Sequence, residues 1–103
     1  MDIDIIAEGN AIQDELLELR RYFHENPERS WEEKNTQKKI MEYLDQLGIP
    51  YIESCGTGVI ATIWGKHSSD KVLGIRADID ALPITELSDV AWKSRWYDAR
   101  LRA

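Results

Sequence analysis

The fold is decided by residues 59–64, which read VIATIW. In an extended chain successive side chains point to opposite faces, so this hexamer is largely apolar on both faces. Residues 72–75, which read VLGI, repeat the pattern. Strands that are apolar on both sides are typical of sheets covered by helices on both faces. We therefore predict an α/β fold, with strands over about residues 51–53, 59–64 and 71–77.

A first helix is expected upstream of these strands, over about residues 11–25. Asn10 and Gln13 have the spacing of a capping box, and Pro27 disfavours helical backbone at the residue before it. Apolar side chains recur at helical spacing at Ile12, Leu16, Leu19 and Phe23.

A second helix is expected over about residues 31–47. Ser30 and Glu33 fit another capping box, with serine at the N-cap and glutamate three residues later. Gly48 stands where a helix commonly ends in a left-handed residue. Residues 85–103 show no clear period, and we predict an irregular tail there. The expected domain is thus two helices followed by about three strands of an incomplete sheet.

The composition limits the classes of function. The chain has 103 residues, the length of one small domain at most. Nineteen acidic and thirteen basic side chains give a net charge of −6, which disfavours nucleic acid or an anionic membrane as the main partner. The N-terminus carries acidic residues where a signal peptide carries basic ones, and a single cysteine excludes an internal disulfide. We expect a cytoplasmic protein.

Several isolated signals point to chemistry only weakly. Residues 56–61, GTGVIA, fit a loose dinucleotide fingerprint, but a strand should follow these glycines rather than the required helix, so a plain turn is favoured. His24 could open the zinc motif H-E-x-x-H, but position 28 is Glu28. We interpret His24 as a helix C-terminal residue and His67 as a solvated turn residue. Cys55 lacks an activating neighbour in the sequence and is expected to be buried or inert.

The stretch most informative about chemistry is residues 76–83, RADIDALP. If the last predicted strand continues into it, Asp78 and Asp80 project to one side at the carboxyl end of the strand, where open α/β sheets place ligands. Two neighbouring carboxylates repel each other and need a metal, a proton or a basic group, for which Arg76 is the nearest candidate. From these residues alone, a functional site and a structural turn with acidic hydrogen-bonding groups are equally open.

Five blocks of sequence, taken together and in their order along the chain, form a pattern. They are LRRYFHENPE at 19–28, SWEE at 30–33, LGI at 47–49, GTGVIA at 56–61 and RADIDALPI at 76–84. Together they resemble the amidohydrolase branch of the zinc aminopeptidase-like metallopeptidases, which contains hippurate hydrolases, N-acyl-amino-acid amidohydrolases and auxin-conjugate hydrolases.

The resemblance implies a fold and an activity. It implies that residues 1–103 are the N-terminal part of a three-layer αβα catalytic domain. It further implies cleavage of the amide bond of small N-acyl amino acids with a divalent metal, zinc or manganese, bound by the full-length enzyme.

The chain also departs from the family pattern. In that branch the metal ligands begin in a Cys/His run shortly downstream, whereas this sequence reads WYDARLRA from residue 96. Asp78 and Asp80 alone cannot assemble a catalytic metal site. We therefore expect a truncated N-terminal piece that binds no metal or cofactor and is inactive alone, with Asp78 and Asp80 as candidates for the active-site floor of the whole enzyme.

The alternative is a non-catalytic module that binds a partner through an open sheet edge. Strands normally covered by later parts of a fold expose edges and apolar faces, which favours self-association. Light scattering distinguishes the two hypotheses, because a clean, stable monomer argues against an unfinished core. Under neither hypothesis do we expect nucleic acid or a membrane as partner.

Overall fold

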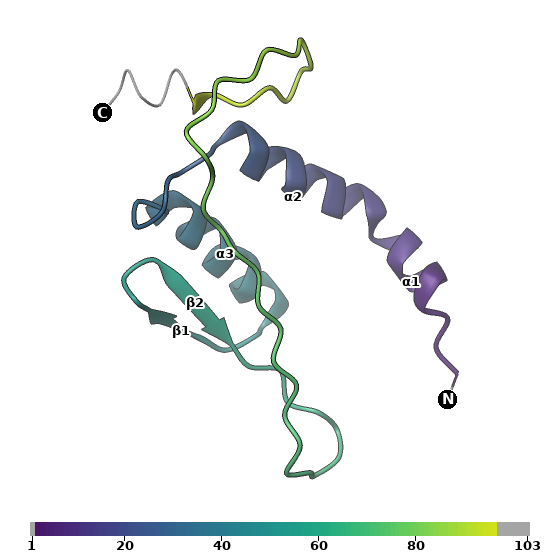
Figure 1. Cartoon of the computed structure of the whole chain (residues 1–103). Coiled ribbons are helices and arrows are strands. Elements are labelled where there is room, and N and C mark those ends of the chain that lie inside the picture. The colour runs from purple at the N-terminus through teal and green to yellow at the C-terminus, as the bar shows by residue number, and fades with distance from the viewer. Residues whose placement is uncertain (1, 97–103) are drawn as a thin grey trace. The chain divides into compact units, whose positions relative to one another are not determined.

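The computed structural model describes residues 2–96, which contain three helices and a two-stranded antiparallel sheet (Figure 1). The helices are α1 (Ile5–Ala11), α2 (Gln13–Glu25) and α3 (Lys34–Leu47), and the strands are β1 (Tyr51–Ser54) and β2 (Gly58–Ala61). The chain divides into two compact units: a first unit with the residues up to Pro27 and from Pro83 onward, and a second unit with Glu28–Leu82. The predicted α/β class is confirmed.

The first unit begins with two helices that are interrupted at Ile12. Asp4 caps α1, because its Oδ1 accepts a hydrogen bond from the Ala7 amide at 3.1 Å. Asn10 lies inside α1, so the predicted capping box of Asn10 and Gln13 is wrong. Helix α2 instead starts after Ile12, whose φ of −109° and ψ of 10° break the helical path and whose side chain makes no capping hydrogen bond.

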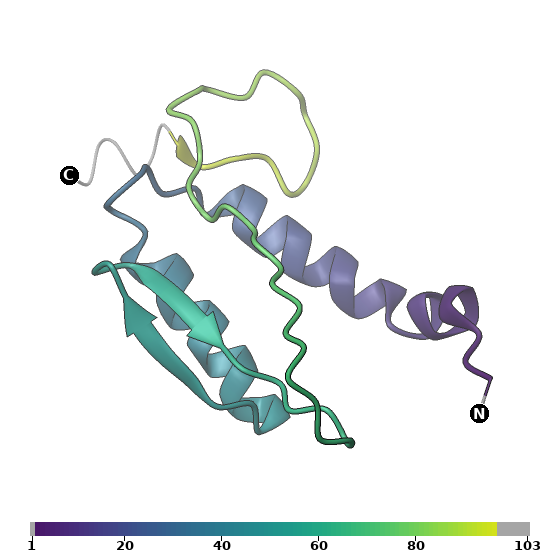
Figure 2. The ribbon, with the colours of Figure 1, turned by 60° about the horizontal axis from the view of Figure 1, so that its bottom comes forward.

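In the second unit, α3 lies beside the hairpin of β1 and β2 (Figure 2). The strands pair from Tyr51 opposite Ala61 to Ser54 opposite Gly58. The chain reverses through Cys55 and Gly56, both at positive φ. A strand therefore starts at Gly58, and the helix that a dinucleotide site would need is not formed there.

The end of α3 agrees with the sequence pattern and its start does not. Gly48 adopts φ 69°, and the Ile49 amide donates to the Leu44 carbonyl at 3.0 Å, as in a Schellman motif. The helix begins at Lys34, three residues later than predicted. Trp31 has a left-handed φ of 69°, so the backbone turns away from a helix after Ser30, and the capping box predicted there is not formed.

The strand content is lower than predicted. β2 ends at Ala61 rather than Trp64. The Thr62 amide still donates to the Pro50 carbonyl at 3.1 Å, but Pro50 has no N–H to donate in return, and α3 ends at Leu47, just before it. The strand predicted over about residues 71–77 is not formed, since no strand among residues 2–96 pairs with it. An apolar pattern predicts where a strand belongs, but only a neighbouring strand completes it.

The buried residues of the described chain are polar. Among residues 2–96 no hydrophobic residue is buried, whereas four polar residues are: Glu33, Thr36, Gln37 and Thr57, each 6–8% exposed. Residues 85–96 of the predicted tail contain no helix or strand, and residues 97–103 lie outside the described part. No helix of the described residues is both long enough and apolar enough to cross a membrane.

Candidate functional site

The predicted site residues of the second unit line one shallow depression. Its volume is about 360 Å³, and it is lined by Ser30, Glu33 and residues 76–80. Asp78 and Asp80 therefore border the same space, and their role as an active-site floor stays a prediction. The structure brings them together through an irregular segment, without the strand on which that expectation was built.

Arg76 is the basic group that the sequence predicted for these acids, and it pairs with one of them. Its Nη2 lies 3.0 Å from Asp78 Oδ1, with the two side chains 89% and 71% exposed. An ion pair this exposed contributes about 0–1 kcal/mol. Arg76 therefore balances the charge of Asp78 without fixing the segment in place.

The acidic segment is fixed by Glu28, a residue that the sequence analysis missed. The Ala81 amide, directly after Asp80, donates to the Glu28 carbonyl at 2.8 Å. The Glu28 carboxylate accepts from the Thr36 amide at 2.5 Å, from Thr36 Oγ1 at 2.7 Å and from the Asn35 amide at 3.2 Å. Glu28 thus caps α3 from outside the helix, in a sequence position that standard capping patterns do not include.

The first turn of α3 also holds the hairpin loop. Gln37 Nε2 donates to the carbonyls of Gly56 at 3.2 Å and Gly58 at 3.0 Å, and Thr57 Oγ1 donates to Glu33 Oε1 at 3.2 Å. A Cβ at Gly58 would lie 2.8 Å from the Ser54 carbonyl oxygen, so this position requires glycine. The GTG sequence therefore has a structural role here.

A second cluster lies in the first unit, around the end of α2. His24 Nε2 lies 3.0 and 3.1 Å from the two carboxylate oxygens of Glu86, and the Ser94 amide donates to Glu86 Oε2 at 2.6 Å. The Ser94 amide and then His24 hold the pKa of Glu86 below its usual range. His24 lies in the last turn of α2, as predicted, but its partner is 62 residues away in sequence and could not be predicted.

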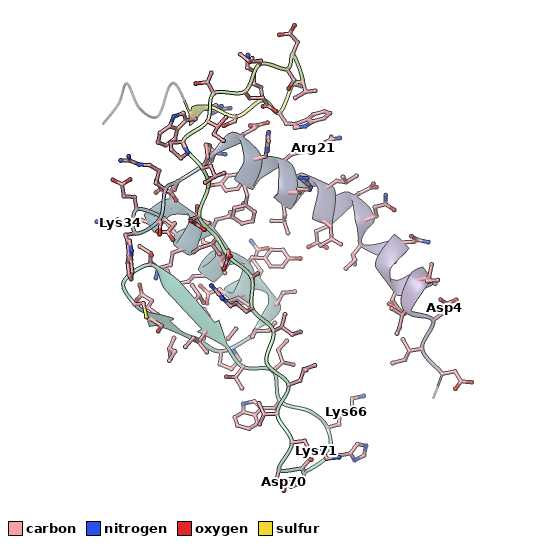
Figure 3. All side chains as sticks on the ribbon, in the orientation of Figure 1. Asp4, Arg21, Lys34, Lys66, Asp70 and Lys71 are labelled. Carbon is pink, nitrogen blue, oxygen red and sulfur yellow. The ribbon has the colours of Figure 1, made fainter. Side chains whose placement is uncertain are left out.

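An aromatic contact adds to this cluster. The Arg21 guanidinium, which projects from α2 (Figure 3), lies 3.8 Å from the centre of the Trp92 ring. Arg21, His24, Glu86 and Trp92 are among the residues that line a depression of about 290 Å³. These contacts tie the segment after Pro83 to α2 within the same unit.

The remaining sequence candidates lie at exposed positions. His67 is exposed in the connection that follows β2, whose tip carries Lys66, Asp70 and Lys71 (Figure 3). Cys55 is a free, exposed thiol at φ 54° in the hairpin turn, so of the two predicted states the buried one is wrong and the inert one stays a prediction. Neither residue borders either depression.

The residues of the first depression do not fit a complete metal centre. Glu33, Asp78 and Asp80 supply carboxylates, but Glu33 accepts from Thr57 and Asp78 pairs with Arg76. Within residues 2–96 no group of three or more His, Cys, Asp or Glu side chains is arranged to hold a metal ion. A catalytic zinc usually takes three protein ligands.

Comparison with known proteins identifies several related hydrolases. No family model matches the chain. It is 44% identical over 86 residues to thermostable carboxypeptidase 2 of Saccharolobus solfataricus, covering 82% of this chain and 22% of the relative. It is 37% identical over 94 residues to hippurate hydrolase of Campylobacter jejuni, covering 90% and 24%. It is 42% identical over 87 residues to N-acetylcysteine deacetylase of Bacillus subtilis, covering 82% and 23%.

A solved structure agrees with these sequence matches. The chain superposes on a dinuclear metal-binding peptidase of the M20 family from Bacillus subtilis with a TM-score of 0.77 at 41% identity, over 84% of this chain and 24% of the peptidase. It therefore spans about a quarter of the length of the relatives it matches. The order of the sequence blocks, the fold and these relatives together show that the chain belongs to the M20-type metal-dependent amidohydrolases and corresponds to their N-terminal region.

Proposed function

We propose that this chain supplies the N-terminal part of the catalytic domain of an amidohydrolase that cleaves the amide bond of N-acyl amino acids. The observation that carries the proposal is the joint match of sequence and fold, at 41% identity and a TM-score of 0.77. Hippurate and N-acetylcysteine, named in two of the relatives, are both N-acyl amino acids. The proposed substrate is therefore a small N-acyl amino acid, and the proposed compartment is the cytoplasm.

In this proposal, Asp78 and Asp80 form part of the active-site floor of the whole enzyme. Both border the depression of the second unit, with Arg76 beside Asp78 and the Glu28 carbonyl holding the residue after Asp80. Zinc or manganese, when bound by the whole enzyme, would polarise the amide carbonyl and lower the pKa of bound water. The described residues do not fit that metal by themselves, so we propose that the 103-residue chain is inactive alone.

A chimera tests the proposed function directly. The matched region of the Bacillus subtilis N-acetylcysteine deacetylase is exchanged for the corresponding residues of this chain. We expect metal-dependent release of acetate from N-acetylcysteine. In the chimera, Asp80→Ala should lower the rate at least tenfold, since residues supporting a metal site typically contribute about 10–100-fold.

Asp70→Ala is the matched control, because Asp70 is an exposed aspartate in the connection after β2. It should leave the rate of the chimera unchanged. A chimera that is folded but inactive would contradict the proposed function. Full activity of the Asp80→Ala chimera would contradict only the role of Asp80.

A second candidate function is self-association of this chain through its exposed apolar segment at residues 72–75. The observation that favours it is the exposure of Val72, Leu73 and Ile75, which are 94%, 85% and 89% exposed in a stretch predicted to be a strand. The relatives are about four times longer, and we propose that segments beyond the matched region cover these residues in them. We propose a second copy as the occupant, with strand pairing as the contact.

Static light scattering over a range of concentrations tests this candidate. Self-association predicts a mass that rises from 11.9 kDa toward twice that value as the concentration increases. A constant monomer mass at all concentrations would exclude it.

A further inference from the structure

Glu28 serves two parts of the second unit at once. Its carboxylate accepts three hydrogen bonds from the first turn of α3, at 2.5, 2.7 and 3.2 Å. Its main-chain carbonyl accepts from the Ala81 amide at 2.8 Å. One residue therefore connects the start of α3 to the segment that carries Asp78 and Asp80.

The carboxylate meets a need that α3 does not satisfy itself. The N-cap residue Glu33 makes no side-chain capping hydrogen bond, and the first turn contains no acidic residue. The first amides of a helix lack partners within the helix, and its N-terminus favours negative charge. With Glu28 in place Thr36 is only 6% exposed, so the Glu28 carboxylate, rather than water, is the partner of its amide and hydroxyl.

The carbonyl meets a need of the acidic segment. Within the described residues, the main chain from 63 to 81 forms one main-chain hydrogen bond to another part of the second unit, from Ala81 to Glu28. The Arg76–Asp78 pair is too exposed to fix the segment. The position of Ala81, and with it the position of Asp80, therefore depends on where peptide 28 is held.

We propose that Glu28 is the positioning residue of the candidate active-site floor. Its carboxylate anchors the residue 28 backbone against α3, and the anchored carbonyl sets the place of the segment that ends at Ala81. That this placement matters for catalysis rests on the proposed function. That Glu28 sets the place of the segment does not.

Amide hydrogen exchange of the full chain, measured by NMR in Glu28→Ala, tests the assignment. We expect the Ala81 and Thr36 amides to exchange at least tenfold faster, while the amides that pair across β1 and β2 change less than twofold. Glu28→Gln retains one side-chain acceptor, so it should restore part of the protection at both positions. Removal of a mere surface charge would not produce this local pattern.

Glu32→Ala is the matched control, because Glu32 lies in the same loop and pairs only on the surface with Arg29, at 2.8 Å and 58% exposed. Its amide exchange should equal that of the unaltered chain. The assignment is overturned by an Ala81 amide that is unprotected in the unaltered chain or unaffected by Glu28→Ala. It is also overturned by an equal acceleration of the hairpin amides, which would show general loss of structure. None of these readings requires activity, so an inactive chimera leaves them intact.

Discussion

Two stretches of the second unit, residues 28–61 and residues 62–82, differ in whether their side chains find partners within the chain. Buried polar side chains are hydrogen-bonded in the first stretch, and apolar side chains are exposed in the second. In the first stretch, the buried side chains of Thr36, Gln37 and Thr57 all have hydrogen-bond partners. In the second, Val72 and Leu73 are 94% and 85% exposed and no strand forms. Both partners of each of these hydrogen bonds lie within residues 28–61, whereas a strand that is apolar on both faces needs neighbouring strands and helices to cover it.

Removing the contact between α3 and the hairpin should have the largest effect on stability. Gln37→Ala deletes the side-chain donor to the carbonyls of Gly56 and Gly58 at a position that is 6% exposed. We expect the free energy of unfolding to fall by about 1–3 kcal/mol, the cost of leaving buried polar groups unpaired. Urea denaturation followed by circular dichroism measures it.

Gln46→Ala is the control for this substitution, because Gln46 is an exposed glutamine on the same helix. Its free energy of unfolding should stay within about 0.5 kcal/mol of that of the unaltered chain. Equal losses for Gln37→Ala and Gln46→Ala would mean that the buried hydrogen bonds do not hold the hairpin.

Alanine substitutions at two glycines compare how strongly the backbone conformation is restricted in the two stretches. Gly48 has φ 69° with open space around its Cβ position, so Gly48→Ala should cost about 1 kcal/mol through backbone strain alone. Gly74 also has open space but no positive φ, so Gly74→Ala should not destabilise the chain. Thermal unfolding of both variants provides the test, and a lower midpoint for Gly74→Ala would indicate that its segment is structured.

The pH dependence of stability tests the tether between β1 and α3. Loss of hydration, together with the hydrogen bond from Tyr51 Oη to Asp45 at 3.1 Å, raises the pKa of Tyr51 above its ordinary value of 10.0. The folded chain thus holds this proton more tightly than the unfolded chain. The contribution is complete below pH 10 and is lost as the pH rises through the raised pKa.

The variant Tyr51→Phe isolates this contribution. Unfolding free energies of the variant and the unaltered chain, measured from pH 8 to 11, should converge toward the alkaline end. A constant difference between the two curves over this range would show that Tyr51 titrates alike in the folded and unfolded states.

The smallest effect on folding is expected in the apolar stretch. Leu73 is 85% exposed, so Leu73→Lys should leave the free energy of unfolding of the monomer within about 0.5 kcal/mol. The same change should reduce any self-association seen by light scattering, since lysine on an exposed edge opposes strand pairing. A large loss of monomer stability would show that Leu73 is packed in solution.

The sequence predicts features of this fold that depend on neighbouring residues. The left-handed Gly48 and the glycine turn before Gly58 were predicted because their backbone requirements are local. Residues 76–80 were singled out for the same reason, as a pair of acids with a nearby arginine, and they line one depression.

Features that depend on distant residues were not predictable. The cap that Glu28 supplies to α3 comes from six residues before the helix, past a left-handed Trp31. The Glu86 partner of His24 lies in another segment of the first unit. The strand predicted over about residues 71–77 requires neighbouring strands, which no local pattern can supply.

The most direct test of the account is hydrolysis of hippurate by the purified 103-residue chain, assayed with and without Mn²⁺ or Zn²⁺. We predict background rates under every condition, because the described acids do not complete a metal centre. The chimera with the deacetylase, run beside it on N-acetylcysteine, should show metal-dependent turnover. Metal-dependent hydrolysis by the chain alone that Asp80→Ala abolishes would contradict the account.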